Sequence, residues 1–305
     1  MPTEAADFFL IDKPTMLMNK RQHRIFCILI TFSILAGCSD LGTEPEYRDY
    51  PADLQADWSP DGQWIVYRHQ DYYSFEYDST YPNGLYLIDT DGNNRKLLVE
   101  GDAFLPSWSP NSRQIVFTTG TILYSINVDG SGREYLTGGR FPRWSPDGQK
   151  IVFTRSGTQD TVGIWIIRLP DRLENRLGFG GMPDWSPDGE QIVFSGHPGT
   201  TRSESQIWKM DSSGNMRVQL TRNSSITNRC PRWSPDGTQI SWTADNEIWI
   251  MDLDGKNQRK LANGTHPSWS PDSRTIVFSD FNPAKNKIVL WRIDVDGRNL
   301  KQLTL

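Results

Sequence analysis

The most regular feature of the sequence is a short apolar run that recurs behind a polar turn. The runs are Ile65–Tyr67, Ile115–Phe117, Ile151–Phe153, Ile192–Phe194, Ile240–Trp242 and Ile276–Phe278. Short runs of β-branched and aromatic residues are typical of strands. Because most of these runs are apolar at three consecutive positions, we predict strands that are covered on both faces.

Each apolar run follows one copy of the string Trp-Ser-Pro-Asp/Asn-Gly/Ser. The copies begin at Trp58, Trp108, Trp144, Trp185, Trp233 and Trp269, with spacings of 36 to 50 residues. A repeat of about 40 residues is typical of solenoids and propellers. The sequence therefore predicts an array of one supersecondary unit.

Further strand-like runs complete each unit. In the first unit Leu85–Ile88 follows Ile65–Tyr67, and another run ends near Leu98 after the turn Asp91-Gly92. Counting the strand that carries the tryptophan, each unit holds four strands and no helix. We therefore predict an all-β fold, a six-bladed β-propeller of four-stranded antiparallel blades, over residues 53–305. The alternative is a solenoid, which would need distinct terminal caps.

The recurring string is interpreted as a joint of the fold. Ser-Pro-Asp-Gly matches a type I turn, with serine first, proline second and glycine fourth. The tryptophan is expected to fill the seam between neighbouring sheets, where its ring buries a large area. We expect the ring to close by packing, unless residues 46–50 add a strand.

The repeat also carries a family resemblance. Trp-Ser-Pro-Asp-Gly, followed by Ile-Val-Phe and then Ile-Trp-x-x-Asp, resembles the WD40-like repeat of TolB-like β-propellers, over about residues 51 to 305. The resemblance implies the propeller fold and is much less specific for function. The α/β domain that precedes the propeller in TolB is expected to be absent, since 19 residues separate Cys38 from Trp58.

The N-terminal segment predicts a location. Basic residues precede the apolar run 25–36, which ends in Leu-Ala-Gly-Cys38 and resembles a bacterial lipobox. We predict a signal peptide over residues 1–37, with translation starting at Met18 or Met16, a lipid on Cys38, and a tether over residues 38–52. An ordinary cleaved signal or a short core helix is the alternative. The expected location is the bacterial cell envelope, lipid-anchored and periplasm-facing, at the outer membrane.

Composition argues against a nucleic-acid partner and against a disulfide framework. The formal net charge is −5, and it becomes −6 without residues 1–37, so no basic footprint for nucleic acid is present. Beyond the signal peptide only Cys38 and Cys230 remain, which gives no disulfide framework. We expect a monomeric propeller with no cofactor and no metal.

One candidate contact surface lies where the first unit breaks the pattern. The insertion 69–83 holds five aromatic residues, Tyr72, Tyr73, Phe75, Tyr77 and Tyr81. Aromatic residues on a loop of a rigid scaffold are typical of protein contacts. The alternative is that these rings pack onto their own hairpin.

A second candidate lies on the innermost strands. The residues just before each tryptophan are Asp57, Ser107, Arg143, Asp184, Arg232 and Ser268. We name Arg143, Asp184 and Arg232 as candidate ligand-binding residues, with structural ion pairs between blades as the alternative. The residues three positions before each tryptophan are mostly apolar and are expected to pack.

The sequence holds few catalytic patterns. It has no Gly-x-Ser-x-Gly string, and we assign no catalytic residue. The prediction is a non-catalytic scaffold that binds an envelope protein, peptide or glycan on the face of the variable loops. One alternative is a metal-dependent glycan-processing enzyme of the polysaccharide lyase type, using His69, His197 and His266. Another is a structural adaptor of an outer-membrane complex.

Overall fold

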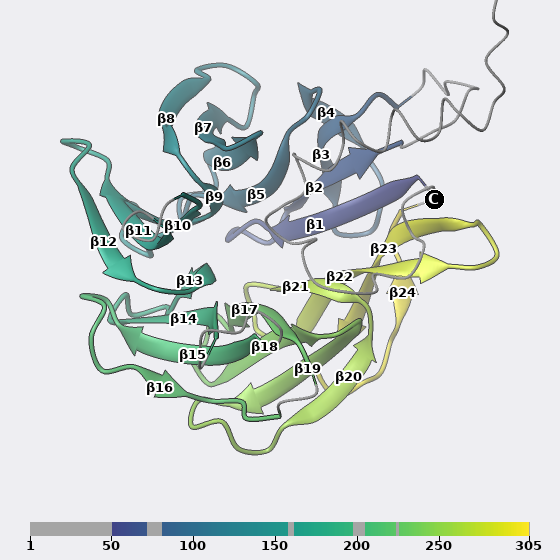
Figure 1. Ribbon diagram of the computed structural model, residues 1–305. Helices are drawn as coiled ribbons and strands as arrows, with labels where there is room; N and C mark the ends of the chain where they lie inside the picture. The colour runs from purple at the N-terminus through teal and green to yellow at the C-terminus, as the bar shows by residue number, and fades with distance from the viewer. Residues whose placement is uncertain (1–50, 72–80, 158–161, 198–204, 224–225, 305) are drawn as a thin grey trace, which may run out of the picture. The chain divides into compact units, whose positions relative to one another are not determined.

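The computed structural model describes residues 51–71, 81–157, 162–197, 205–223 and 226–304. Contacts divide the chain into residues 1–40 and 41–305, and every described residue belongs to the second unit. The described residues form strands without a helix (Figure 1), and none of them builds a helix that could cross a membrane. The predicted signal peptide, Cys38 and the tether up to residue 50 lie outside the described residues.

The strands follow the repeat in runs of four. The first three runs are β1 (Ala52–Trp58), β2 (Trp64–Gln70), β3 (Gly84–Asp89), β4 (Lys96–Glu100); β5 (Phe104–Trp108), β6 (Gln114–Thr119), β7 (Ile122–Asn127), β8 (Glu134–Gly138); and β9 (Arg140–Trp144), β10 (Lys150–Arg155), β11 (Gly163–Arg168), β12 (Glu174–Gly178). The others are β13 (Gly181–Trp185), β14 (Gln191–Gly196), β15 (Gln206–Asp211), β16 (Val218–Gln219); β17 (Asn228–Trp233), β18 (Gln239–Ala244), β19 (Glu247–Asp252), β20 (Arg259–Asn263); and β21 (Thr265–Trp269), β22 (Thr275–Asn282), β23 (Lys287–Asp294), β24 (Lys301–Gln302).

The way these strands join corrects the sequence prediction. An all-β propeller is present, but the prediction of six separate four-stranded blades is wrong, because only four four-stranded sheets stand alone among the described residues. The remaining strands form one eight-stranded sheet, in which β1 pairs in parallel with β23 at Ala52 and Ile288. The Ile288 amide donates to the Pro51 carbonyl at 3.0 Å. The prediction that the ring closes by packing alone is therefore also wrong, because this hydrogen bond joins the first and last runs of strands.

The first strand of each run lies innermost, and these strands follow one another around an axis. Contacts link β1 to β5, β5 to β9, β9 to β13, β13 to β17, β17 to β21, and β21 back to β1. Each of these strands ends on the tryptophan of its repeat. The residues next to each tryptophan are therefore brought together on the axis, although they are far apart in sequence.

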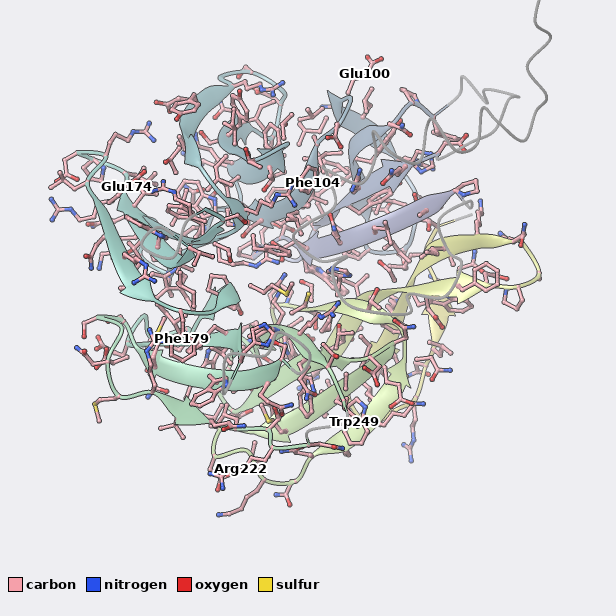
Figure 2. The ribbon with its side chains drawn as sticks, in the orientation of Figure 1. Glu100, Phe104, Glu174, Phe179, Arg222 and Trp249 are labelled. Atoms are coloured by element: carbon pink, nitrogen blue, oxygen red, sulfur yellow. The ribbon has the colours of Figure 1, made fainter. Side chains whose placement is uncertain are left out.

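The core confirms the prediction of strands covered on both faces. Ile115, Val116 and Phe117 are fully buried in the middle of β6, and the matching triplets of β10 and β14 are fully buried too. Each triplet ends on an aromatic residue, which pairs with a second aromatic residue on the next strand. The six pairs are Tyr67–Tyr86, Phe117–Tyr124, Phe153–Trp165, Phe194–Trp208, Trp242–Trp249 and Phe278–Trp291. Cross-strand aromatic pairs stabilise sheets, and Trp249 of one pair is labelled in Figure 2.

The Ser-Pro-Asp-Gly strings form the predicted turns. In the first copy the Gly62 amide donates to the Ser59 carbonyl at 2.9 Å, and Gly62 has a φ of 75°. The tryptophans fill the seams as expected: Trp108, for example, packs in one cluster with Val66 of the preceding run and Ile115 of its own run. The role of the string as a joint is confirmed.

Candidate binding site on the ring axis

A cavity of about 230 Å³ lies where the tryptophan strings meet on the axis. Its walls include the residue before each tryptophan, namely Asp57, Ser107, Arg143, Asp184, Arg232 and Ser268. Prolines of the Ser-Pro-Asp turns also line it, among them Pro60, Pro146 and Pro235. The cavity therefore belongs to the tight-turn side of the ring, whereas the sequence interpretation placed the binding face on the variable loops.

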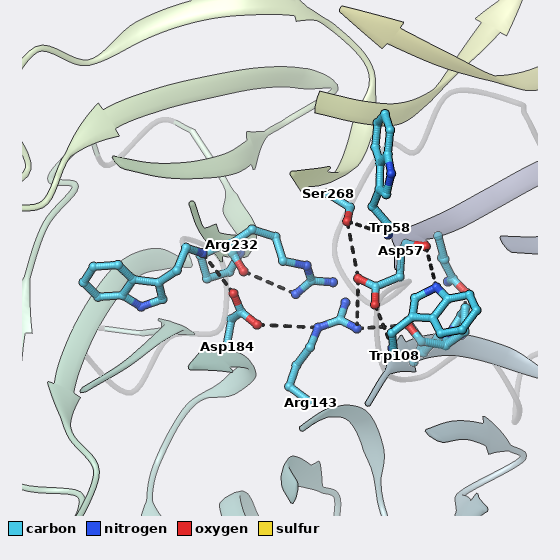
Figure 3. A network of polar contacts seen from close by, with 12 residues as sticks. Asp57, Trp58, Trp108, Arg143, Asp184, Arg232 and Ser268 are labelled. Carbon is cyan, nitrogen blue, oxygen red and sulfur yellow. Dashed lines mark hydrogen bonds and ion pairs between the residues drawn. The ribbon is translucent and has the colours of Figure 1, made fainter. Parts of the chain in front are cut away.

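Arg143 is the centre of the charged network in this cavity (Figure 3). Its Nη1 lies 3.7 Å from Asp57 Oδ1, and its Nε lies 3.8 Å from Asp184 Oδ1. Nη1 also donates to the Pro106 carbonyl at 2.9 Å. Arg143 is 8% exposed, so these contacts are shielded from water. One buried guanidinium thus bridges carboxylates from two different sheets.

The two carboxylates are fixed by the backbone of the following run of strands. The Trp108 amide donates to Asp57 Oδ2 at 2.9 Å, and the Trp233 amide donates to Asp184 Oδ2 at 2.9 Å. Ser268 repeats this contact, because its hydroxyl accepts from the Trp58 amide at 3.1 Å. Asp57, Asp184 and Ser268 therefore connect neighbouring runs around the ring, as the interpretation of structural contacts between blades expects.

Burial changes the acidity of both carboxyl groups. Loss of hydration raises the pKa of Asp184 to about 7, although Arg143 and the Trp233 amide act in the opposite direction. Loss of hydration also raises the pKa of Asp57, against the opposing effect of Arg143. The charge of Asp57 also raises the pKa of Asp184, because like charges repel. The cavity can therefore exchange a proton near neutral pH.

Arg232 contributes a second guanidinium to the cavity. Figure 3 shows Arg232 and Arg143 extending into the same space between Asp57 and Asp184. Arg232 Nη1 donates to the carbonyl of Pro231 at 3.3 Å, and its buried Nε has no hydrogen-bond acceptor among the described residues. Within the described part of the chain no carboxylate forms an ion pair with Arg232. Its Nε is available to a bound acceptor group.

The structure brings together three of the predicted site residues and places Tyr81 apart from them. Arg143, Asp184 and Arg232 share the cavity. Tyr81, 41% exposed, lies outside its walls and packs edge-on against His69 and Tyr86 on its own run of strands. Tyr72, Tyr73, Phe75 and Tyr77 lie outside the described residues. Sequence reasoning missed the wall of tryptophan and proline rings, although their repetition around the charged positions was the available signal.

The histidines are not gathered in the cavity. His69 Nδ1 lies 2.7 Å from Asp53 Oδ1, and neither His69, His197 nor His266 lines the cavity. Among the described residues, no three His, Cys, Asp or Glu side chains come together as a metal site. What the cavity offers is a set of hydrogen-bond donors and acceptors between aromatic walls, an arrangement suited to binding.

Comparisons with known proteins agree with the repeat. Residues 72–305 match the TolB beta propeller domain family. An uncharacterised protein of Agrobacterium fabrum is 28% identical over 109 residues, 33% of this chain and 36% of the relative. The Tol-Pal system protein TolB of Rhizorhabdus wittichii is 38% identical over 55 residues, 17% of this chain and 12% of the relative. The matches thus span about a third of the first relative and far less of the second.

Solved structures share the fold at low identity. TolB from Acinetobacter baumannii superposes with a TM-score of 0.63 at 20% identity, over 84% of this chain and 64% of that one. Oligogalacturonate lyase from Vibrio parahaemolyticus superposes with a TM-score of 0.55 at 13% identity, over 85% and 78%. These two likenesses show the fold alone. The family match spans well over half of the sequence, so the chain belongs to the TolB beta propeller domain family.

Proposed function

We propose that this chain is a non-catalytic, monomeric binding scaffold of the bacterial cell envelope that holds a protein or peptide partner in the axial cavity. The observation that carries this proposal is Arg232, a second guanidinium in a cavity whose two carboxylates both lie against Arg143. A peptide supplies carbonyl or carboxylate acceptors for it, and the tryptophan and proline walls suit an apolar side chain.

The envelope location is supported by two independent features. The apolar run ending in Leu-Ala-Gly-Cys38 supports a lipid anchor on Cys38. The Rhizorhabdus relative is a Tol-Pal system protein. We expect Cys38→Ala to move the protein out of the membrane fraction, and an unchanged membrane fraction would show that the anchor is elsewhere.

Cross-linking in cells followed by pull-down from membranes tests the binding role. We expect the full chain to capture a defined protein, and Arg232→Ala to lose most of it. The matched control is Arg298→Ala, which removes an arginine whose side chain is 82% exposed. Equal recovery by wild type and Arg232→Ala would exclude the cavity as the site. A captured glycan instead of a protein would contradict the partner class.

The enzyme alternative is tested by metal analysis of the purified protein. A stoichiometric transition metal that disappears in His69→Ala would contradict the non-catalytic proposal. His69 is the informative residue, because Asp53 already orients its ring through Nδ1. We expect no such metal.

A further inference from the structure

A second ring of side chains lies on the innermost strands, three residues before each tryptophan. Its members are Gln55, Leu105, Phe141, Met182, Cys230 and His266. All six have left-handed backbone with φ between 51° and 57°, at the point where the strand pairing shifts register. None of them lines the axial cavity. This bulge ring is therefore a separate layer with its own chemistry.

Side chains of the bulge ring reach the same position on the neighbouring strand. Gln55 Oε1 accepts from the Leu105 amide at 2.9 Å. Met182 Sδ lies 3.6 Å from Cys230 Sγ. The strand that follows β17 around the ring is β21, and it carries His266 at the equivalent position. Met182, Cys230 and His266 thus succeed one another on three adjacent strands.

The side chains of Cys230 and His266 include polar groups that could bind a ligand. Both ring nitrogens of His266 are buried and have no hydrogen-bond partner among the described residues. Buried imidazole nitrogens are normally paired, so an unsatisfied ring is a candidate ligand for a bound ion. Cys230 is 4% exposed and forms no disulfide. Two sulfur atoms in contact, with an unsatisfied imidazole at the equivalent position of the adjacent strand, are the donor types that soft metal ions prefer.

We propose that Met182, Cys230 and His266 form a site for a soft monovalent metal ion, Cu(I). The ion would be held by the thioether, the thiolate and one imidazole nitrogen. Binding forms a Cu–S bond to Cys230 and releases the thiol proton to solvent, so that one proton is freed for each ion bound. The donor set disfavours magnesium and calcium, which take oxygen ligands.

Anaerobic titration of the full chain with Cu(I), in competition with a chromophoric chelator, tests the site. We expect one ion that is lost in Cys230→Ala and bound at least about tenfold more weakly in Met182→Leu. X-ray absorption of the complex should show two sulfur donors and one nitrogen donor, with one sulfur fewer in Met182→Leu. The fall in pH of unbuffered samples should correspond to one proton released for each Cu(I) ion bound.

The matched control is Met210→Leu, which removes a buried methionine outside the bulge ring. Leucine nearly conserves the volume of methionine, so both methionine variants are expected to fold. The proposal is wrong if the wild type binds no Cu(I), or if Met182→Leu and Met210→Leu bind it equally. Neither result bears on partner capture by the axial cavity, which Arg232→Ala tests separately.

Discussion

Two aspartate residues that flank the same tryptophan meet opposite environments in this fold. Asp184, one residue before its tryptophan, has a side chain that is only 16% exposed, and loss of hydration raises its pKa to about 7. Asp188, three residues after the same tryptophan, is close to solvent, and its pKa is lowered chiefly by the hydroxyl of Ser186. The sequence gives the residue type and its spacing from the tryptophan. The difference in burial, which makes the two pKa values differ, arises only in the tertiary structure.

Replacing Arg143 by methionine should strongly destabilise the protein. The change leaves the largely buried Asp57 and Asp184 without the cation that lies 3.7 and 3.8 Å from them. Removing one partner of a buried ion pair costs about 3–5 kcal/mol. Urea unfolding followed by tryptophan fluorescence measures the loss. Arg298→Met is the control, and a similar small effect of both variants would show that the axial network is not stabilising.

Stability should depend on pH through Asp184. Its pKa is about 7 in the folded protein against 3.8 for the ordinary group. The folded state therefore binds more protons than the unfolded chain between these values, so this group's contribution to stability falls as pH rises from about 4 to 7 and is level above. Asp184→Asn removes this contribution and keeps an acceptor for the Trp233 amide.

Free energies of unfolding of wild type and Asp184→Asn at several pH values measure this effect. We expect the variant to gain stability relative to wild type as the pH rises from about 4.5 to 7.5. Parallel profiles of the two proteins would contradict the raised pKa.

At the scale of elements, the turn is the best-predicted feature. Asp188 Oδ1 accepts from the Ser186 hydroxyl and from the Glu190 amide at 3.0 Å. In the second copy of the string Asn111 makes the same two contacts, to Ser109 and Arg113. These contacts are local, so the sequence alone specifies them.

Asp188→Ala should destabilise the protein by about 0.5–2 kcal/mol, because the Glu190 amide loses its side-chain acceptor and the Ser186 hydroxyl keeps only the Gln191 carbonyl, at 3.1 Å. Asp188→Asn is the matched control, since an asparagine already serves in the second copy. Thermal unfolding compares the two. If alanine and asparagine shift the midpoint equally, the side-chain acceptor does not hold the turn.

At the scale of the whole molecule, the decisive feature is the seam between the first and last runs of strands. Leu303 lies in one cluster with Ile65 of β2 and Leu290 of β23. The Leu303 amide donates to the Leu290 carbonyl at 2.8 Å, next to the place where Pro51 pairs with Ile288. Both described ends of the chain therefore cover the outer edge of β23.

Leu303→Ala should open this seam and lower the free energy of unfolding by about 2–5 kcal/mol, because Leu303 is 4% exposed. Leu300→Ala is the control, since Leu300 is 56% exposed and such surface changes stay within about 0.5 kcal/mol. Differential scanning calorimetry measures both. Equal midpoints for the two variants would show that the seam does not limit stability.

The sequence by itself determined the strands, the turns, the tryptophan seams and the propeller class, because each depends on patterns repeated within about 40 residues. It also indicated Arg143, Asp184 and Arg232. Only the tertiary structure decided that β1 and β23 share one sheet, that the cavity opens beside the tight turns, and that Met182 meets Cys230. These features join residues from different repeats, and their energies depend on burial and on ring geometry, which no local pattern contains.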